Sequence, residues 1–477
     1  MRTAPPDLPG SQTTDSPIDR ALALMLADEG EAALRWAAAV VDQDVTPSAL
    51  ILTCRLLADA GRTEAAIEGL ELAVKQATNA GNLPLAVAAV ADLRQLGRPV
   101  DGYFDEIAAS FCLGSPRLTD TPPPPPPLPS FETFQPLSSF LAGPALLSKA
   151  TSVVHVARER YEQAQNAPEL PPIASLPLFS ALEMEGLRAL VAAFEMITVP
   201  AGQAVIAEGE EGAEAYIVAR GELEVRRKPG VPDEGGEVTL ARLVNGSLFG
   251  EMALLSRAPR AASVVACRPS ILLVARRDAL DKVAEARPDV GVELAAHCRR
   301  RMVANLVRTS RVLIDVHPDA RPALVERFET CVFEKGDHLI RIGEEAAGLH
   351  LIASGEVAVV GYESSEPEWT DSSLAGGSPR RSTQADGRSE PLVISTLGAG
   401  EVVGEVALVL RRKALADVVA VHPTVTLHLP REDFISLIKD HPAILGTLYL
   451  SAIARDDETT AVIANATTRV TDDYILV

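Results

Sequence analysis

Residues 249–265 read FGEMALLSRAPRAASVV, and this stretch carries the main indication of the fold and function of the chain. Gly250 and Glu251 open a short apolar turn, and Arg260 follows nine positions later (260 − 251 = 9). Glycine lets backbone approach a ligand closely, the first turn of a helix offers N–H groups to a phosphate, and arginine adds a forked cation. Glu251 can also accept a hydroxyl hydrogen, so the stretch predicts a site for a ligand with a phosphate and a sugar hydroxyl, a nucleotide.

The pattern FGE-x-A-L…P-R-A-A-[ST]-V resembles the phosphate-binding cassette of the cyclic nucleotide-binding domain family. The barrel signature of that family is matched upstream by a Pro-x-Gly turn, an apolar strand, Gly-Glu, and an aromatic strand that ends in Gly-Glu. The matching residues are Pro200, Gly202, Val205, Ile206, Gly209, Glu210, Tyr216, Ile217, Val218, Gly221 and Glu222. The resemblance implies a β-roll (jelly roll) of about eight short strands over Pro200–Val274, followed by hinge and lid helices. A roll that keeps this shape without a ligand is the alternative.

The resemblance also implies a role for each cassette residue. The predicted cyclic nucleotide-binding residues are Gly250, Glu251, Met252, Ala253, Arg260, Ala261, Ala262 and Ser263. Glu251 would hold the ribose 2′-hydroxyl, Arg260 the cyclic phosphate, and nearby backbone groups the remaining oxygens. Guanine-selective members of the family usually carry Thr directly after the arginine, where this chain has Ala261, so cyclic AMP is expected rather than cyclic GMP. The residue that caps the base is expected within 297–302, with no choice among them.

A second copy of the roll follows the first. Four landmarks recur 134 residues later: Phe194, Gly202, Gly209 and Gly221 recur as Phe328, Gly336, Gly343 and Gly355. The offset then grows to 154, where Gly404-Glu405 repeats Gly250-Glu251 (404 − 250 = 154). The twenty extra residues fall in an insertion at 361–391 that is rich in Ser, Gly and charge, and this composition predicts a loop.

The second copy lacks the phosphate-binding arginine. Ala414 stands 154 residues after Arg260, and Asp417 adds a negative charge three positions later. The loss of one charge-assisted contact costs about 1.5–3 kcal/mol, or roughly ten- to a hundredfold in affinity. Arg412 or Lys413 could substitute for it. We expect this degenerate second roll to bind cyclic nucleotide weakly or not at all and to act structurally.

The N-terminal part of the chain predicts helices. Residues 18–114 are rich in Ala and Leu at helical spacing. A short motif recurs three times and ends each time in glycine, at Gly30, Gly61 and Gly97, which are 31 and 36 residues apart. That spacing is similar to the roughly 34-residue period of tetratricopeptide repeats, and a plain helical bundle is the alternative. Either arrangement could present a face to a protein partner. Residues 115–172 read as a proline-rich linker, with six prolines at 122–127, and a helical segment.

The predicted fold class is therefore a multidomain α and β chain, an N-terminal α-helical repeat or bundle followed by two β-rolls with flanking helices. The expected domains are 18–114, 115–172, 173–311 with the intact cassette, 312–460 with the degenerate one, and a tail at 461–477. Tandem rolls behind a helical segment resemble the regulatory subunits of protein kinase A.

Composition and motif content exclude several classes of function. The formal charge of −21 argues against a nucleic-acid partner. No apolar run is long enough to cross a membrane and no signal peptide begins the chain, so a cytoplasmic location is expected. Five dispersed cysteines and eight scattered histidines form no metal-binding motif, and no nucleophile–base pair or cofactor motif occurs, so neither a metal, a cofactor nor an enzyme is expected.

Two functions fit these observations. The first is a regulatory protein that binds a cyclic mononucleotide and relays the event to an unidentified protein partner through its helical region. The alternative is a scaffold or adaptor that uses both rolls as interaction modules without a ligand.

Overall fold

The computed structural model describes residues 16–120, 134–164, 170–227, 237–255, 259–310, 324, 326–362 and 391–473. The six prolines at 122–127 and nearly all of the insertion predicted at 361–391 lie outside the described residues. The chain divides into two compact units. One comprises Met1–Glu208, Ala213–Leu254 and Ala262–His297, and the other Gly209–Gly212, Leu255–Ala261 and Cys298–Val477.

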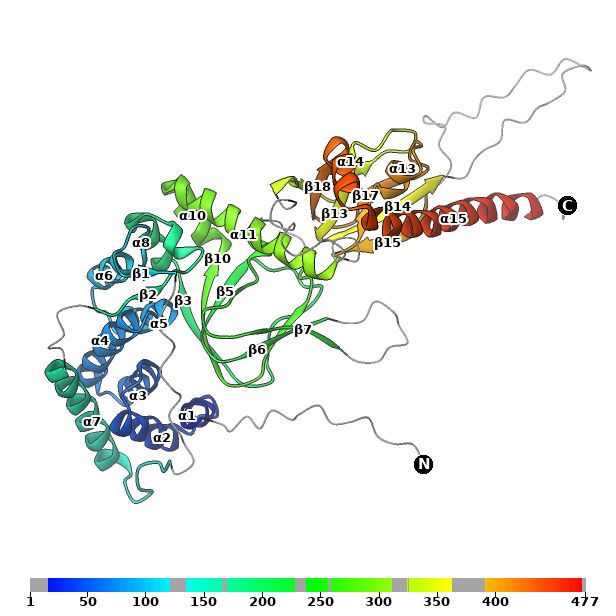
Figure 1. Ribbon diagram of the computed structural model, residues 1–477. Helices are drawn as coiled ribbons and strands as arrows, with labels where there is room; N and C mark the ends of the chain where they lie inside the picture. Colours follow the sequence, from blue (N-terminus) through cyan, green and yellow to red (C-terminus); the bar gives the residue numbers. More distant parts are fainter. Residues whose placement is uncertain are drawn as a thin grey trace, which may run out of the picture. The chain divides into compact units, whose positions relative to one another are not determined.

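The N-terminal part of the first unit is helical, as predicted (Figure 1). Its helices are α1 (Pro17–Leu26), α2 (Gly30–Gln43), α3 (Pro47–Asp59), α4 (Thr63–Asn79), α5 (Leu83–Gln95), α6 (Asp101–Phe111), α7 (Gly143–Ala164) and α8 (Met184–Ala192). Gly61, Gly81 and Gly97 follow α3, α4 and α5 with φ of 77°, 74° and 76°. Glycine enters this left-handed region without a steric penalty and so ends a helix, which explains two of the three recurring glycines.

Helix α7 packs against α2 and α4. Its buried residues lie on one stripe, Leu146, Ala150, Val153, Val154 and Ala157. Charged side chains flank the stripe, and Lys149 lies 3.6 Å from Asp42 in an ion pair. One face of the helical region is therefore covered by a segment of this same chain.

The first roll consists of two four-stranded antiparallel sheets. Its strands are β3 (Glu195–Val199), β4 (Ala204–Ile206), β5 (Glu214–Arg220), β6 (Leu223–Arg227), β7 (Val238–Leu243), β8 (Leu248–Phe249), β9 (Ser263–Ala266) and β10 (Ser270–Arg276). One sheet has the order β3-β10-β5-β8 and the other β4-β9-β6-β7. Alternate side chains such as Val218 and Leu272 point between the sheets and form the core of the roll.

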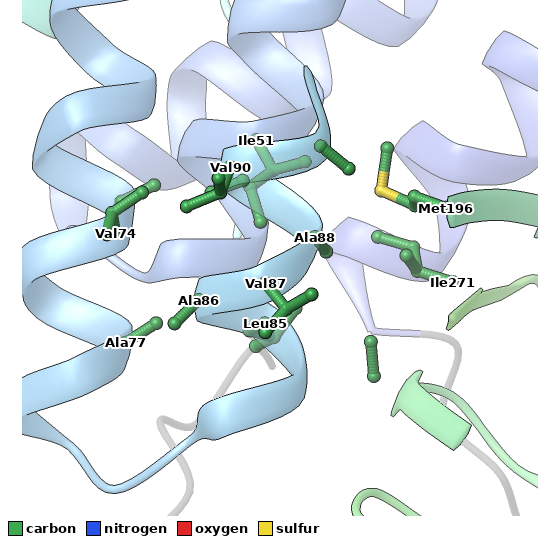
Figure 2. Close-up of a cluster of buried hydrophobic side chains, with 14 of the residues drawn as sticks. Ile51, Val74, Ala77, Leu85, Ala86, Val87, Ala88, Val90, Met196 and Ile271 are labelled. Carbon is green, nitrogen blue, oxygen red and sulfur yellow. The ribbon is translucent and has the colours of Figure 1, made fainter. Parts of the chain in front are cut away.

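The opposite side of the β3-β10-β5-β8 sheet packs against helix α5. Figure 2 shows Ala88 of α5 close to Met196 and Ile271 of the roll, while Ala86 faces helix α4. Helix α5 is accordingly buried on all sides from Leu83 to Leu93. One continuous apolar cluster therefore joins the helical region to the first roll, so the two parts stabilise each other.

The second roll repeats the first strand by strand. Its strands are β11 (Glu329–Phe333), β12 (His338–Ile340), β13 (Gly348–Ser354), β14 (Glu356–Tyr362), β15 (Pro391–Gly398), β16 (Val402–Val403), β17 (Asp417–Ala420) and β18 (Thr424–Pro430). They form antiparallel sheets β11-β18-β13-β16 and β12-β17-β14-β15. The start of β11 lies 134 residues after that of β3 (329 − 195), and β18 starts 154 after β10 (424 − 270). The duplication expected from the sequence is confirmed.

Flanking helices follow each roll, as the predicted fold class has them. Short helices α9 (Met252–Leu255) and α13 (Glu405–Val409) lie within the two cassettes. Helices α10 (Arg277–Ala286) and α11 (Pro288–Thr309) follow the first roll, and α14 (Arg431–Asp440) and α15 (Pro442–Asp473) follow the second. The backbone of α15 runs through most of the segment expected as a tail. Within the described ranges, no helix is both long enough and apolar enough to traverse a bilayer.

Candidate functional site

Gly250 and Glu251 form the turn that leads into α9. Gly250 has a φ of 75°, which glycine adopts without strain. The backbone oxygen of Glu251 accepts a hydrogen bond from the N–H of Leu254 at 3.0 Å, which starts the turn of helix. Glu251 is only 4% exposed, and a carboxylate at this depth requires hydrogen-bond donors around it. Met252 follows at the surface of the turn and is half-buried.

Arg260 is fixed through its main chain to the turn that follows β4. Its N–H donates to the oxygen of Glu210 at 2.8 Å, and its own oxygen accepts from the N–H of Gly209 at 2.9 Å. The guanidinium lies over Gly212, where an added Cβ would stand 2.4 Å from both Nε and Nη2 of Arg260. Glycine at 212 therefore leaves the space that the guanidinium takes up.

The residues after Arg260 enter strand β9. Ala261 is exposed and Ala262 is half-buried. The hydroxyl of Ser263 accepts a hydrogen bond from the N–H of Glu208 at 3.0 Å, which ties β9 to the end of the β4 segment. Ser263 was predicted to lie in the ligand site, and in the structure its hydroxyl makes this structural contact. Ala253 lies within α9.

The second roll keeps the same backbone arrangement with different side chains. Ala414 donates to the oxygen of Glu344 at 2.9 Å and accepts from the N–H of Gly343 at 2.8 Å, as Arg260 does in the first roll. The position of Gly212 is taken by Ala346 (346 − 212 = 134). The arginine and the glycine beneath it are thus replaced together, and the backbone bridge remains.

Asp417 is held inside the second roll by groups of the roll itself. It is 1% exposed and accepts hydrogen bonds from the N–H of Ile342 and the hydroxyl of Tyr362, both at 2.6 Å. Nε2 of His338 lies 3.4 Å from the same carboxylate. The Asp417 side chain is therefore buried and engaged by groups of the second roll, and its effect on a bound phosphate stays a prediction.

Glu405 is the counterpart of Glu251 (405 − 251 = 154), and Arg455 of helix α15 lies beside it. Nη1 of Arg455 donates to the carboxylate of Glu405 at 2.6 Å. Burial raises the pKa of Glu405, and Arg455 opposes this shift. Arg412, considered above as a substitute for the missing arginine, instead forms an ion pair with Asp456.

Sequence reasoning missed Gly212 and Arg455. Gly212 lies in the turn after Gly209-Glu210. The replacement of this glycine by alanine at the matching position of the second copy could have identified it from the sequence. Arg455 lies fifty residues beyond Glu405 (455 − 405 = 50), and no local pattern links residues so far apart.

Helix α11 carries the residues among which a base cap was expected. His297, Cys298 and Met302 are buried on one side of the helix. Arg299, on the same helix, is half-buried and donates to the backbone oxygen of Phe328. The choice of a capping residue stays a prediction. In the part of the chain that the structure describes, no group of three or more His, Cys, Asp and Glu side chains could hold a metal ion.

Comparison with known proteins agrees with this geometry. Residues 196–287 and 330–441 match the family model described as "Cyclic nucleotide-binding domain". Among curated proteins, the cGMP-dependent protein kinase 2 of Mus musculus is 26% identical over 260 residues, covering 54% of this chain and 29% of the kinase. The cAMP-dependent protein kinase regulatory subunit of Yarrowia lipolytica is 28% identical over 231 residues, covering 48% of this chain and 50% of the subunit.

A second regulatory subunit, from Hypocrea atroviridis, is 32% identical over 188 residues, covering 38% of this chain and 39% of the subunit. The matched part of this chain therefore covers from 29% to 50% of the length of these three relatives. The matched segments coincide with the two β-rolls and the helix after each. Residues 196–287 and 330–441 are thus two tandem members of the cyclic nucleotide-binding domain family.

Proposed function

We propose that this chain is a non-catalytic regulatory protein that binds one cyclic mononucleotide in its first roll. The observation that carries the proposal is the contrast between the two rolls at one backbone bridge. The first roll has Arg260 lying over Gly212, and the second has Ala414 and Ala346 at the same places. An arginine fork recognises a phosphate through charge-assisted hydrogen bonds, which alanine cannot make.

Glu251 would accept a hydrogen bond from the ribose 2′-hydroxyl, and Arg260 would donate to the cyclic phosphate. The backbone of Gly250, Met252 and Ala253 would supply further donors. Cyclic AMP is the proposed ligand because Ala261 offers no hydroxyl next to the arginine. Some relatives are named for cGMP and others for cAMP, so the relatives do not distinguish the two ligands. The choice of cyclic AMP therefore rests on the residues of this chain.

The protein partner would receive the signal through the first unit. Helix α5 packs directly on strands β3, β5 and β10, so a shift of the roll changes the packing of the helical region. The regulatory subunits among the relatives suggest a protein kinase as the class of partner.

Equilibrium titration of the full chain with cyclic AMP and cyclic GMP tests this proposal. The full chain is required because the isolated residues 173–311 would expose the sheet face that α5 covers. We expect micromolar or tighter binding, stronger for cyclic AMP, and a ten- to hundredfold loss in Arg260→Ala. No binding of either nucleotide would favour the scaffold alternative.

A further inference from the structure

Two adjacent residues of helix α15 are tied to the cassette of the second roll. Arg455 donates to the carboxylate of Glu405 at 2.6 Å, to Glu401 at 3.3 Å and to the backbone oxygen of Val402. Three acceptors thus hold one guanidinium, and Glu405, at 1% exposure, is the most deeply buried of the carboxylates it meets. A buried ion pair of this kind is geometrically specific, because either charge alone would be costly to bury.

The second tie lies at the other end of the cassette. Asp456 forms an ion pair with Arg412, which precedes the alanine that replaces the phosphate-binding arginine by two positions. Arg455 and Asp456 therefore hold the start and the end of the cassette at the same time. Below them, α15 is anchored by Ile444, Leu448 and Ala452, all fully buried.

The space between α15 and the cassette is small and mainly apolar. Its walls include Ala414, Leu415 and Val418 of the roll and Arg455 and Thr459 of the helix. The cavity measures about 80 Å³. Pockets for small-molecule ligands generally measure roughly 300–1,000 Å³, so a nucleotide needs α15 to move away.

We propose that α15 closes the second roll in cis. Arg455 of this helix binds the Glu405 carboxylate, whose counterpart in the first roll, Glu251, is proposed to bind the ligand. In the second roll the cassette carboxylate is thus paired by a residue of the same chain, and the C-terminal helix stays in place without nucleotide. The role of Glu405 as a ligand-site counterpart rests on the function proposed for Glu251. The closure itself rests only on contacts of the second unit.

Amide hydrogen exchange of the full chain, measured without nucleotide, tests the closure. In Arg455→Ala we expect exchange over Ala452–Thr459 to rise at least tenfold, because Glu405 loses its buried partner and the helix loses one of its two ties. The matched control is Arg431→Ala, which removes an exposed ion pair with Glu345 (3.1 Å) from the neighbouring helix α14. It should leave α15 unchanged.

A second variant covers the case in which Arg455→Ala unfolds the whole second roll. Glu405→Gln keeps a hydrogen-bond acceptor and removes the charge, so it should loosen α15 by several-fold with the strands still protected. Unchanged exchange of α15 in both variants would overturn the proposal. So would protection of α15 by added cyclic AMP in Arg260→Ala, since that result would mean that the second roll binds the nucleotide. A chain that binds no nucleotide but loosens α15 in these variants would refute the proposed function and leave the closure standing.

Discussion

His350 and His428 lie directly across from each other on β13 and β18, with ring centroids 4.4 Å apart. The matching residues of the first roll are Tyr216 and Val274 (350 − 216 = 134; 428 − 274 = 154). His350 is 7% exposed, and its Nδ1 lies 3.0 Å from the hydroxyl of Thr426. Among the described residues, Nε2 of His428 is buried without a hydrogen-bond partner. The second roll thus holds a pair of imidazoles at positions where the first has a tyrosine and a valine.

This pair predicts that the second roll is sensitive to acid. Burial, and then the neighbouring His428, lower the pKa of His350 from 6.5 to about 3, and burial lowers the pKa of His428. The facing charged group is Glu329, 4.0 Å from Nδ1 of His428. A histidine whose folded pKa is depressed contributes full stability above pH 6.5 and loses it as pH falls toward the folded pKa. Between pH 7 and pH 5 we expect the second roll to lose about 2 kcal/mol.

Hydrogen exchange of β13 and β18 as a function of pH measures this loss, after correction for the intrinsic exchange rate. His350→Tyr, which installs the residue of the first roll, should flatten the profile whatever constant change in stability it causes. An identical pH dependence in the wild type and the variant would mean that other groups control acid sensitivity.

Asp92 of helix α5 predicts the opposite pH dependence in the helical region. It is 4% exposed, and burial raises its pKa from 3.8 to about 7, while Arg55, 3.7 Å away, lowers it. A carboxyl with a raised folded pKa stabilises the fold below pH 3.8 and loses that contribution as pH rises toward 7. Asp92→Asn should therefore stabilise the first unit at pH 8 by on the order of 1–4 kcal/mol.

Exchange of α3 and α5 amides at pH 5 and pH 8 checks the prediction for Asp92. Asp59→Asn is the matched control, since Asp59 is an exposed carboxylate that also acts on Asp92. A stabilisation by Asp59→Asn as large as that by Asp92→Asn would show that surface charge, and not burial, is responsible.

Ile271 tests the link between helix α5 and the first roll. It is buried in the cluster that both parts share, and Figure 2 shows it on the roll side facing α5. Removal of a buried side chain of this size costs about 2–5 kcal/mol, and a shared core distributes that cost to both parts. Ile271→Ala should thus raise exchange in α5 as well as in β5 and β10.

Val393→Ala is the control for Ile271→Ala, because Val393 is 58% exposed and its truncation costs roughly 0.5 kcal/mol or less. If Ile271→Ala loosened the strands and left α5 unchanged, the helical region would be an independent domain.

Much of this architecture was predictable from local patterns. The ordered glycine, aromatic and apolar landmarks that resemble the family predicted the β-roll, and the offsets of 134 and 154 between paired glycines predicted the duplication and its insertion. The packing of α5 on the roll was not predictable, since apolar residues on all sides of a helix indicate burial and do not identify the second partner. The same holds for Glu405 and Arg455, because an ion pair between distant residues leaves no periodic signal.

The first roll is proposed to be a receptor and its duplicate is not, and the number of cyclic nucleotides bound per full chain distinguishes these two cases. Calorimetric titration with cyclic AMP should yield one site per chain, and Arg260→Ala should weaken that site by ten- to a hundredfold while Arg412→Ala leaves it unchanged. Two sites per chain, or binding that survives Arg260→Ala at full strength, would contradict the account.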